Sequence, residues 1–480
     1  MGISKPNVVF IFPDTQEAKD TSCYGGEVPT PHIDRLAAEG MKFTRNQSNG
    51  PLCTPARYNV LTGQYASRCR SLPVTYPQDD SAFLLWNTDL LPGDRTIGHV
   101  LQEQGYKTGL SGKWHCGRPS LIPIPADADP HEPAVRDMLL ENDCRICEYV
   151  AGFGFDEVYA MCLNNPRSAH VPEVVREHNQ PEITKGALDF LEKYRDEPFF
   201  LHVCPTLPHA PGVLDVLESG LWASHRGYIE PLPDVQPSYE DLLARLDALS
   251  SGGKRNGHAA SVMWMDDGVG AILAKIDELG LAENTLVIFS TDHGARGKNT
   301  CYHNFTPCVA RWPGVVAPGS ECEELVGTVD IAATILDACG VPAPDDLPMD
   351  GRSFVPLLKQ EETDWPDSLF IESTYVRAVL MKDWSYQAVR FPRTLQRRVT
   401  TENRREFTQS GRPASAARYK AHTIFPGYYD DDQLYDLRED PLEQVNLAAN
   451  SECAERLAEM QDRLRAYSET LPYAFGEFKS

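Results

Sequence analysis

The chain has 480 residues, of which 41% are hydrophobic and 24% are charged, and it contains 34 Gly and 37 Pro. This length and composition are typical of a loop-rich globular enzyme with one large domain and a smaller one. The formal net charge of −24 argues against non-specific binding to nucleic acid, and no apolar run is long enough to cross a membrane.

The first residues of the chain and the spacing of its cysteines indicate in which cellular compartment the protein is expected. Residues Met1–Pro6 lead directly into an apolar strand and lack a small-residue cleavage site, so they do not resemble a signal peptide. We expect a cytoplasmic protein as the chain is given, or a periplasmic or secreted one if a native signal has been removed. The 13 Cys show no repeating spacing, and Cys144-x-x-Cys147 lacks the second pair that a zinc ribbon needs. Reduced cysteines are therefore expected.

The first strand signal is the apolar run Asn7–Phe12, which is typical of a strand buried on both faces of a parallel sheet. Asp14 follows this run, at the sheet edge where the loops of doubly wound folds build their sites. An amphipathic helix is predicted at Pro31–Glu39, ending at Gly40, and a second strand at Lys42–Asn46.

Strand and helix signals then alternate to about residue 340, which predicts a large, mostly parallel sheet between layers of helices. Residues 118–180, rich in Pro, Asp and Glu, interrupt this alternation and are interpreted as an irregular insertion. Further helices are predicted from about residue 57 and at 95–104, 183–193, 259–279 and 329–339, with strands at 106–111, 198–204 and 286–290.

A polar, Pro-rich segment at 342–350 is interpreted as a boundary between domains at 1–345 and 346–480. The second domain is predicted to contain a short antiparallel sheet, a closing helix and a basic insertion at 390–422. Its strands are expected at 368–372, 378–381 and 385–389, and its helix at 454–464.

Polar side chains follow the predicted strand ends, as Asp14 follows the first. Each of these side chains, taken alone, is an ordinary turn residue or a surface or core group whose hydrogen bonds are made within the protein. Their shared position indicates a site instead, because the carboxyl ends of parallel strands gather at one edge of a sheet. The later members of this set are Lys113, His115, His209, Asp292 and His293.

The segment Leu52–Arg57 contains Cys-x-Pro-x-Arg and is followed by Leu61-Thr62-Gly63. Alone, this short pattern fits an ordinary buried thiol. It occurs together with Gly112-Lys113-Trp114-His115, with the strand and loop Asn284–Gly294 and with Leu434-Tyr435-Asp436-Leu437. Together these segments resemble the signatures of the type I sulfatases, formylglycine-dependent enzymes of the alkaline phosphatase superfamily. The resemblance implies an alkaline-phosphatase-like α/β fold, and Ala56 stands where that family usually has Ser.

In that family the cysteine of the first motif is oxidised to formylglycine, so the resemblance implies that Cys53 becomes an aldehyde that hydrates to a geminal diol. One hydroxyl attacks sulfur, and deprotonation of the other expels sulfate and restores the aldehyde. A serine nucleophile would instead remain as a stable sulfated residue. Maturation implies a formylglycine-generating enzyme as a partner.

The resemblance also implies one divalent metal ion, held by Asp14, Asp292, His293 and the modified residue at 53. Hard carboxylate ligands favour Ca²⁺, the first choice, with Mg²⁺ as an alternative. The family often has more carboxylates at this site and Asn beside the later Asp. Here the single imidazole of His293 favours Mn²⁺, and the Asp-His pair is similar to that of phosphonate monoester hydrolases and choline sulfatases.

The resemblance also implies catalytic roles for the residues of this chain that match the motifs of the family. Arg57 and Lys113 are expected to hold the diol, and Asp292 to act as the base for the attacking hydroxyl. His115 matches the group that deprotonates the second hydroxyl. His209 and Lys298 match positions that grip the sulfate, and either could protonate the leaving alcohol.

The segment 390–422 contains nine Arg and Lys and two Glu, a local charge of +7. One interpretation is a solvated loop paired with acidic surface elsewhere. The other is a substrate-binding loop in which Arg397 and Arg398 bind further anionic groups of a sulfated saccharide.

Three functions remain in competition at this stage. The first is sulfate ester hydrolysis, of a small-molecule or saccharide substrate. The second is hydrolysis of phosphonate monoesters or phosphodiesters by the same machinery. The third is a binding protein that keeps only the fold, and the full set of catalytic residue types argues against it. An oligomer is compatible with the sequence.

Overall fold

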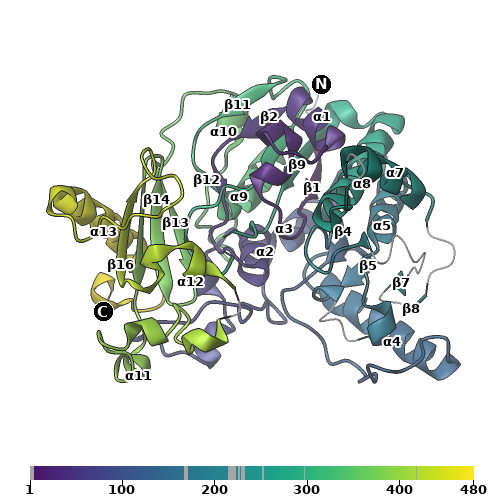
Figure 1. The fold of residues 1–480 in the computed structure, drawn as a ribbon. Helices are drawn as coiled ribbons and strands as arrows, with labels where there is room; N and C mark the ends of the chain where they lie inside the picture. The colour runs from purple at the N-terminus through teal and green to yellow at the C-terminus, as the bar shows by residue number, and fades with distance from the viewer. Residues whose placement is uncertain are drawn as a thin grey trace.

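The computed structural model describes residues 5–166, 171–214, 223–224, 227–228, 233–250, 253–296, 298–417 and 419–479. Its centre is an eight-stranded sheet in the order β11-β2-β10-β9-β1-β6-β4-β5 (Figure 1). All neighbouring strands run parallel except β10, which is antiparallel to both of its neighbours. The strands are β1 (Asn7–Ile11), β2 (Met41–Phe43), β4 (Lys107–Lys113), β5 (Glu157–Cys162), β6 (Phe199–Cys204), β9 (Thr285–Ser290), β10 (Cys308–Arg311) and β11 (Ser320–Cys322).

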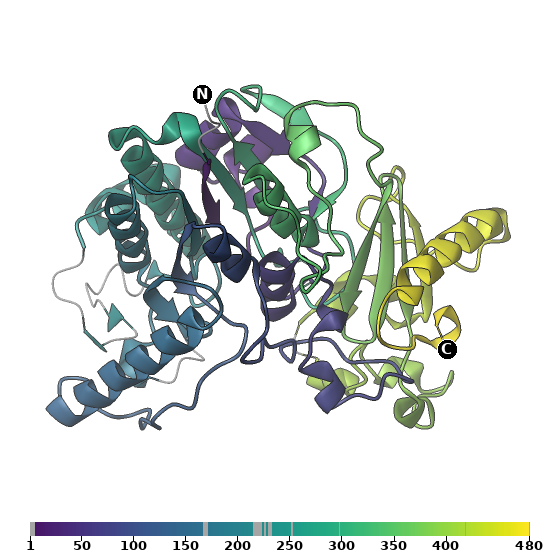
Figure 2. The ribbon, with the colours of Figure 1, turned by 180° about the vertical axis from the view of Figure 1, so that it is seen from behind.

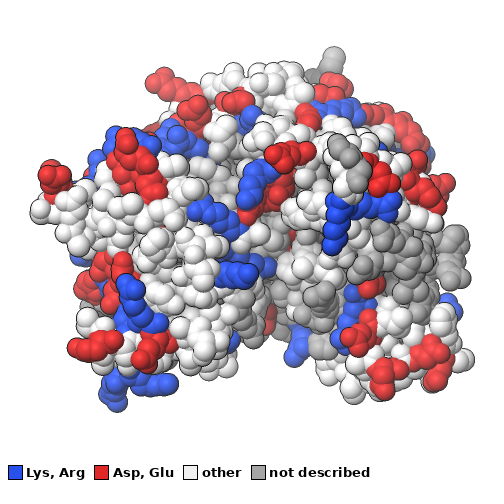
Figure 3. All heavy atoms as spheres, in the orientation of Figure 1, with Lys and Arg blue, Asp and Glu red and all other residues white. Residues whose placement is uncertain are grey.

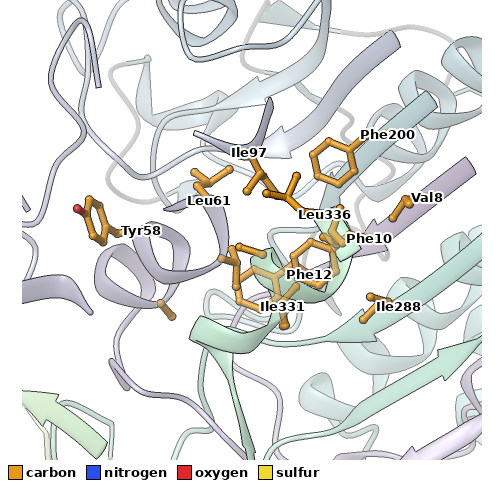
Figure 4. Packing of buried hydrophobic residues seen from close by; sticks show 14 of the residues in the cluster. Val8, Phe10, Phe12, Tyr58, Leu61, Ile97, Phe200, Ile288, Ile331 and Leu336 are labelled. Atoms are coloured by element: carbon orange, nitrogen blue, oxygen red, sulfur yellow. The ribbon is translucent and has the colours of Figure 1, made fainter. Parts of the chain in front are cut away.

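Strand β1 is buried along its whole length because both faces of the sheet are covered. Alternate residues supply two separate cores, as expected for side chains that point to opposite faces. Val8 and Phe10 belong to one core, in which Leu61 and Ile331 also pack (Figure 4). Val9 belongs to the other core. The continuous apolar run in the sequence follows from this burial on both sides.

The helices form the two outer layers. On the face of Val8 and Phe10 lie α2 (Cys53–Thr62), α3 (Ile97–Glu103) and α9 (Thr328–Ala338), which contribute to the same core. The other face is covered by α1 (Pro31–Glu39), α5 (Gln180–Lys193), α7 (Tyr239–Ser250) and α8 (Gly257–Glu278) (Figures 1 and 2).

A second sheet has four antiparallel strands in the order β13-β14-β15-β16, with the C-terminal helix α13 packed on one face (Figure 2). Leu347, Phe354 and Leu358 pack in the core of the large sheet, beyond the predicted domain boundary at 345. That boundary stays a prediction. The elements here are β13 (Ser368–Ser373), β14 (Val376–Met381), β15 (Trp384–Val389), β16 (Asp432–Asp436) and α13 (Ala454–Glu469).

The smaller elements connect these layers. Helix α4 extends from the end of the molecule that carries β5 (Figure 1). In the described part of the chain, two short strand pairs lie outside the main sheets. Among the described residues, the remaining α-helices and strands, short 3-10 turns aside, are α4 (Pro133–Ala151), α10 (Val355–Leu358), α11 (Arg393–Gln396), α12 (Ala421–Ile424), β3 (Asn46–Gln47), β12 (Val326–Gly327), β7 (Ala223–Ser224) and β8 (Gly227–Tyr228).

The predicted fold class is confirmed: a mixed, mostly parallel sheet lies between helices, and a smaller antiparallel sheet follows it. The interpretation of 118–180 as an irregular insertion was wrong, because α4 and the edge strand β5 lie within it. The strand predicted at Lys42–Asn46 is interrupted and forms β2 and β3. Helix α2 begins at Cys53, four residues before the predicted start, since Pro55 in a first turn costs no intrahelical hydrogen bond.

Within the described part of the chain, no helix is both long and apolar enough to span a bilayer. Acidic and basic side chains are interspersed over the face shown in Figure 3 instead of forming one basic surface. Several arginines of the segment 390–422 pair with acidic residues outside it: Arg390 with Asp432 and Glu477, Arg393 with Asp79, and Arg404 with Asp431.

Candidate active site

Four neighbouring strands of the large sheet, in the order β9-β1-β6-β4, deliver the polar residues that the sequence singled out. Two hydrogen bonds hold the loops after these strands together. The backbone N–H of Asp14, after β1, donates to Leu207 O after β6, and Thr291 Oγ1, after β9, donates to Pro13 O. The loops that carry Asp14, His209 and Asp292 are therefore fixed against one another.

Cys53 is the first residue of α2, and its side chain is 1% exposed. Its Sγ lies 3.3 Å from His293 Nε2 and 3.6 Å from Asp14 Oδ1. Burial, and then the charge of Asp14, raises the pKa of the Cys53 thiol to about 12. In the absence of a bound cation, the unmodified thiol therefore stays protonated at neutral pH.

Four buried side chains lie close together and carry the kinds of donor atoms that bind a metal ion. The candidate ligand atoms of Asp14, Cys53, Asp292 and His293 all lie within 4.8 Å of one another. His293 Nδ1 lies 2.8 Å from Gly294 O and donates to it, which leaves a lone pair on Nε2 facing the group. Burial lowers the pKa of His293 to about 4, so the imidazole is neutral at pH 7.

Two cations stand beside these carboxylates. Arg57 Nη2 lies 3.2 Å from Asp292 Oδ2 and 3.9 Å from Asp14 Oδ2, and Lys113 Nζ donates to Asp14 Oδ2. Burial alone would raise the pKa of Asp14, but the ammonium of Lys113 holds that pKa well below its usual range. Both carboxylates also accept hydrogen bonds from Thr15, through its hydroxyl and its backbone N–H.

The end of β4 requires glycine at position 112. Gly112 has φ +106°, and a Cβ atom there would lie 2.2 Å from Cys204 O on the neighbouring strand β6. Because only glycine avoids this clash, the chain can turn here and direct Lys113 toward Asp14. His115 also has a positive φ of 58° and its side chain lines the same cavity as Cys53.

Three further groups of the predicted site lie at this cavity. Burial, followed by the charge of Lys113, lowers the pKa of His115 well below its ordinary value, and burial also lowers the pKa of His209. Lys298 Nζ lies 3.0 Å from His209 Nε2. Thus Cys53, His115, His209 and Lys298 all face one cavity of about 580 Å³.

Several lining residues were not anticipated from the sequence. Asn165 accepts a hydrogen bond from Lys113 and contacts His209, and it lies in the segment that was interpreted as irregular. Asn165 follows the edge strand β5, and recognition of that strand would have been the signal to find it. The other unanticipated residues at the cavity are Trp86, Asp89, Gly117, Arg118, Leu163, Asn164 and Tyr419.

The predicted substrate-binding residues Arg397 and Arg398 are exposed, and neither is among the described residues that line this cavity. The later part of the basic segment does reach it. Tyr419 lines the cavity, and Arg412 lines a smaller adjoining one of about 30 Å³ that shares Trp86, Lys298 and Tyr419 with it. Arg418, counted in the basic segment, lies outside the described residues.

Comparison with known proteins agrees with this geometry. The family model described as Sulfatase matches residues 6–341. Human steryl-sulfatase is 27% identical over an alignment that covers 99% of this chain and 90% of that protein. The N-acetylgalactosamine-6-O-sulfatase of Bacteroides thetaiotaomicron is 25% identical, covering 96% and 93%. The solved structure of the phosphonate monoester hydrolase of Agrobacterium radiobacter superposes with a TM-score of 0.62 at 18% identity, covering 97% and 96%.

The family match covers far more than half of the chain, and the named relatives align along nearly all of it. The structural likeness to the phosphonate monoester hydrolase shows a shared fold. The resemblance seen in the sequence motifs is confirmed, and the chain belongs to the sulfatase family, whose members hydrolyse sulfate esters.

Proposed function

We propose that the protein hydrolyses a sulfate monoester of a carbohydrate and that formylglycine made from Cys53 is its nucleophile. The observation that carries this proposal is the position of Cys53, at the N-terminus of α2, beside three metal-type donors and at the wall of a cavity. Hydrated formylglycine offers one hydroxyl for attack and a second whose deprotonation releases sulfate. A formylglycine-generating enzyme is the partner that maturation requires.

A single divalent metal ion would be held by Asp14, Asp292, His293 and residue 53. The donors fit such an ion, because the two carboxylates supply anionic oxygens and His293 presents a neutral nitrogen whose partner nitrogen is fixed by Gly294. The carboxylates favour Ca²⁺, our first choice, or Mg²⁺, and the imidazole favours Mn²⁺. Bound there, the ion would withdraw charge from a sulfate oxygen and lower the pKa of a neighbouring hydroxyl.

Arg57 and Lys113 position residue 53. Arg57 lies one helical turn after residue 53 in α2, and Lys113, the last residue of β4, donates to Asp14 Oδ2. Both are fully buried, so their charges act in a medium of low polarity where they attract anions strongly. Asp292, next to Arg57, is the proposed base that takes the proton of the attacking hydroxyl.

His115 is the proposed base for the second hydroxyl of residue 53. It lines the same cavity, and its Nδ1 is buried with no hydrogen-bond partner among the described residues. A neutral imidazole with a free ring nitrogen can accept a proton. Lys298, on the same wall, is the proposed group that grips the sulfate, and its ammonium nitrogen lies 3.0 Å from His209 Nε2.

The cavity supports a saccharide as the substrate. Its volume of about 580 Å³ suits a small ligand, and it combines the aromatic residues Trp86 and Tyr419 with the polar residues Asp89 and Arg118. Asp89 accepts a hydrogen bond from the backbone of Gly117, which fixes the carboxylate beside Arg118. Such a wall can bind sugar hydroxyls, and the named relative that acts on a sulfated amino sugar agrees with this class.

A screen of sulfated saccharides tests the proposal. We expect release of inorganic sulfate from at least one of them, with kcat/KM above that for a small aryl sulfate. The Cys53→Ala variant should release none, and full activity in that variant would exclude the mechanism.

The second candidate is hydrolysis of phosphonate monoesters or phosphodiesters. It is supported by the Asp292-His293 pair and by the likeness to a phosphonate monoester hydrolase. Comparison of kcat/KM on matched aryl sulfate and aryl phosphonate esters separates the two functions. A large preference for the phosphonate ester would favour the second candidate.

A further inference from the structure

The hydrogen bonds around Asn165 determine which nitrogen of His209 carries a proton. Lys113 Nζ lies 2.6 Å from Asn165 Oδ1, and an ammonium group can only donate. The carbonyl oxygen of the Asn165 amide is therefore the atom that faces Lys113. The NH₂ group of the same amide must face the other way, toward His209.

His209 Nε2 is consequently an acceptor. It lies 3.0 Å from Asn165 Nδ2 and 3.0 Å from Lys298 Nζ, and both of these nitrogens can only donate hydrogen bonds. The opposite nitrogen, Nδ1, lies 2.6 Å from the carbonyl oxygen of Ala210, which can only accept. Both sides of the ring thus require the same tautomer, with the proton on Nδ1 and a lone pair on Nε2.

We propose that Asn165 is a positioning residue that holds His209 in this tautomer, so that Lys298, and not His209, supplies the proton to the leaving alcohol. This assignment rests on the proposed sulfatase function and decides between the two candidate acids. As the S–O bond of the ester breaks, its electron pair stays on the leaving oxygen. That oxygen forms an O–H bond with a proton from Lys298 Nζ, and the resulting neutral amine regains a proton from water.

The arrangement favours Lys298 for a geometric reason. Nε2 is the only nitrogen of His209 that faces Lys298, and in this tautomer it has no proton to give. Lys298 uses one N–H toward His209 and lines the cavity that contains Cys53. The acceptor on His209 therefore orients the ammonium, whose other hydrogens remain for the substrate.

Nitrogen NMR of histidine-labelled protein tests the tautomer without any turnover. The His209 signals are assigned by their loss in the His209→Gln variant. We expect Nδ1 protonated and Nε2 unprotonated in the wild type. In Asn165→Asp the new carboxylate can only accept, so Nε2 should become protonated. Asn164→Asp is the matched control: it places the same charge one residue away in the same cavity, and the tautomer should not change.

The proposal is overturned if the wild type carries its proton on Nε2, or if both Asp variants change the His209 signals alike. These outcomes do not depend on the substrate. If the protein releases sulfate from no ester, the proposed function is wrong. The NMR measurement of the His209 tautomer does not depend on that result.

Leaving-group dependence tests the role of Lys298. An acid that protonates the leaving oxygen matters most for alkyl or sugar sulfates, whose alcohols leave poorly, and least for nitrophenyl sulfate. Lys298→Ala should lower kcat by roughly 10²–10⁴-fold on the poor leaving group and by far less on the good one. Asn165→Asp should show the same selectivity at roughly tenfold. Equal losses on both substrates would contradict the assignment.

Discussion

The Nε2 atom of His293 lies 3.3 Å from Sγ of Cys53, while the opposite ring nitrogen donates to the carbonyl oxygen of Gly294. This backbone contact fixes the orientation of the imidazole and leaves the lone pair of Nε2 directed at residue 53. Asp14 and Asp292 add carboxylate oxygens within 4.8 Å. Four residues that are far apart in the sequence thus form one donor group beside the proposed nucleophile.

The first prediction concerns the metal content. His293→Ala removes one donor of the group, so the ion retained after dialysis should fall from about one per chain to well below that value. Inductively coupled plasma mass spectrometry gives both the amount and the element. The matched control is His303→Ala, because His303 Nδ1 pairs with Glu443 at 3.2 Å and lies outside the donor group. Equal metal content in the two variants would contradict the assignment.

The second prediction concerns the stability that Arg57 provides. Its guanidinium is 1% exposed and lies 3.2 Å from Asp292, so Arg57→Ala leaves a buried carboxylate without this partner. The free energy of unfolding of the metal-free protein should fall by about 3 kcal/mol. Arg393→Ala is the control, since Arg393 and Asp79 are 65% and 70% exposed and their pair contributes little. Urea denaturation measures both, and comparable losses would contradict the prediction.

The third prediction concerns pH. His258 Nε2 lies 3.0 Å from Asp20 Oδ1, and this hydrogen bond raises the pKa of His258 in the folded protein. The folded state therefore binds the proton more tightly than the unfolded state. The resulting stabilisation is complete below the unfolded pKa of about 6.5 and is lost as pH rises through the folded value.

The His258→Gln variant isolates this contribution. The difference in the free energy of unfolding between wild type and variant should be larger in acid than at alkaline pH. The change should stay below about 1 kcal/mol, because the His258 side chain is 44% exposed and solvent screens the pair. Urea denaturation on both sides of neutrality measures it. A difference that grows with rising pH would have the wrong sign.

The fourth prediction concerns the basic segment. Arg412 adjoins the cavity through Trp86, Lys298 and Tyr419, so Arg412→Ala should raise KM several-fold for a saccharide with a second sulfate. KM for a small aryl sulfate should not change. The double variant Arg397→Ala/Arg398→Ala is the comparison, and we expect a smaller effect from it. If the double variant alone raises KM, the original expectation for Arg397 and Arg398 is the better one.

Much of the fold could be predicted because burial leaves a direct mark on sequence. Strand β1 is covered on both faces, so the run Asn7–Phe12 is apolar throughout. Helix α1 matches its predicted bounds because Pro31 begins it and Gly40 follows its last residue. Since the strands are parallel, the loops after them had to meet, and the donor group around Asp14 follows from that topology.

The segment 118–180 could not be predicted in the same way. Strand β5 lies at the edge of the sheet, and most of its residues are only half-buried, so it lacks a continuous apolar run. Asn165 and Arg118 therefore had no recognisable element to place them. Their contacts depend on residues far away in sequence, such as His209 and Asp89, which spacing alone cannot reveal.

The most direct test of the account is the mass of the tryptic peptide 46–57, which contains residue 53, in a preparation that hydrolyses sulfate esters. The protein should be made in a host that has a formylglycine-generating enzyme. We predict the aldehyde or its hydrate at position 53, in proportion to specific activity. An active preparation in which this peptide carries only unmodified cysteine would contradict the account.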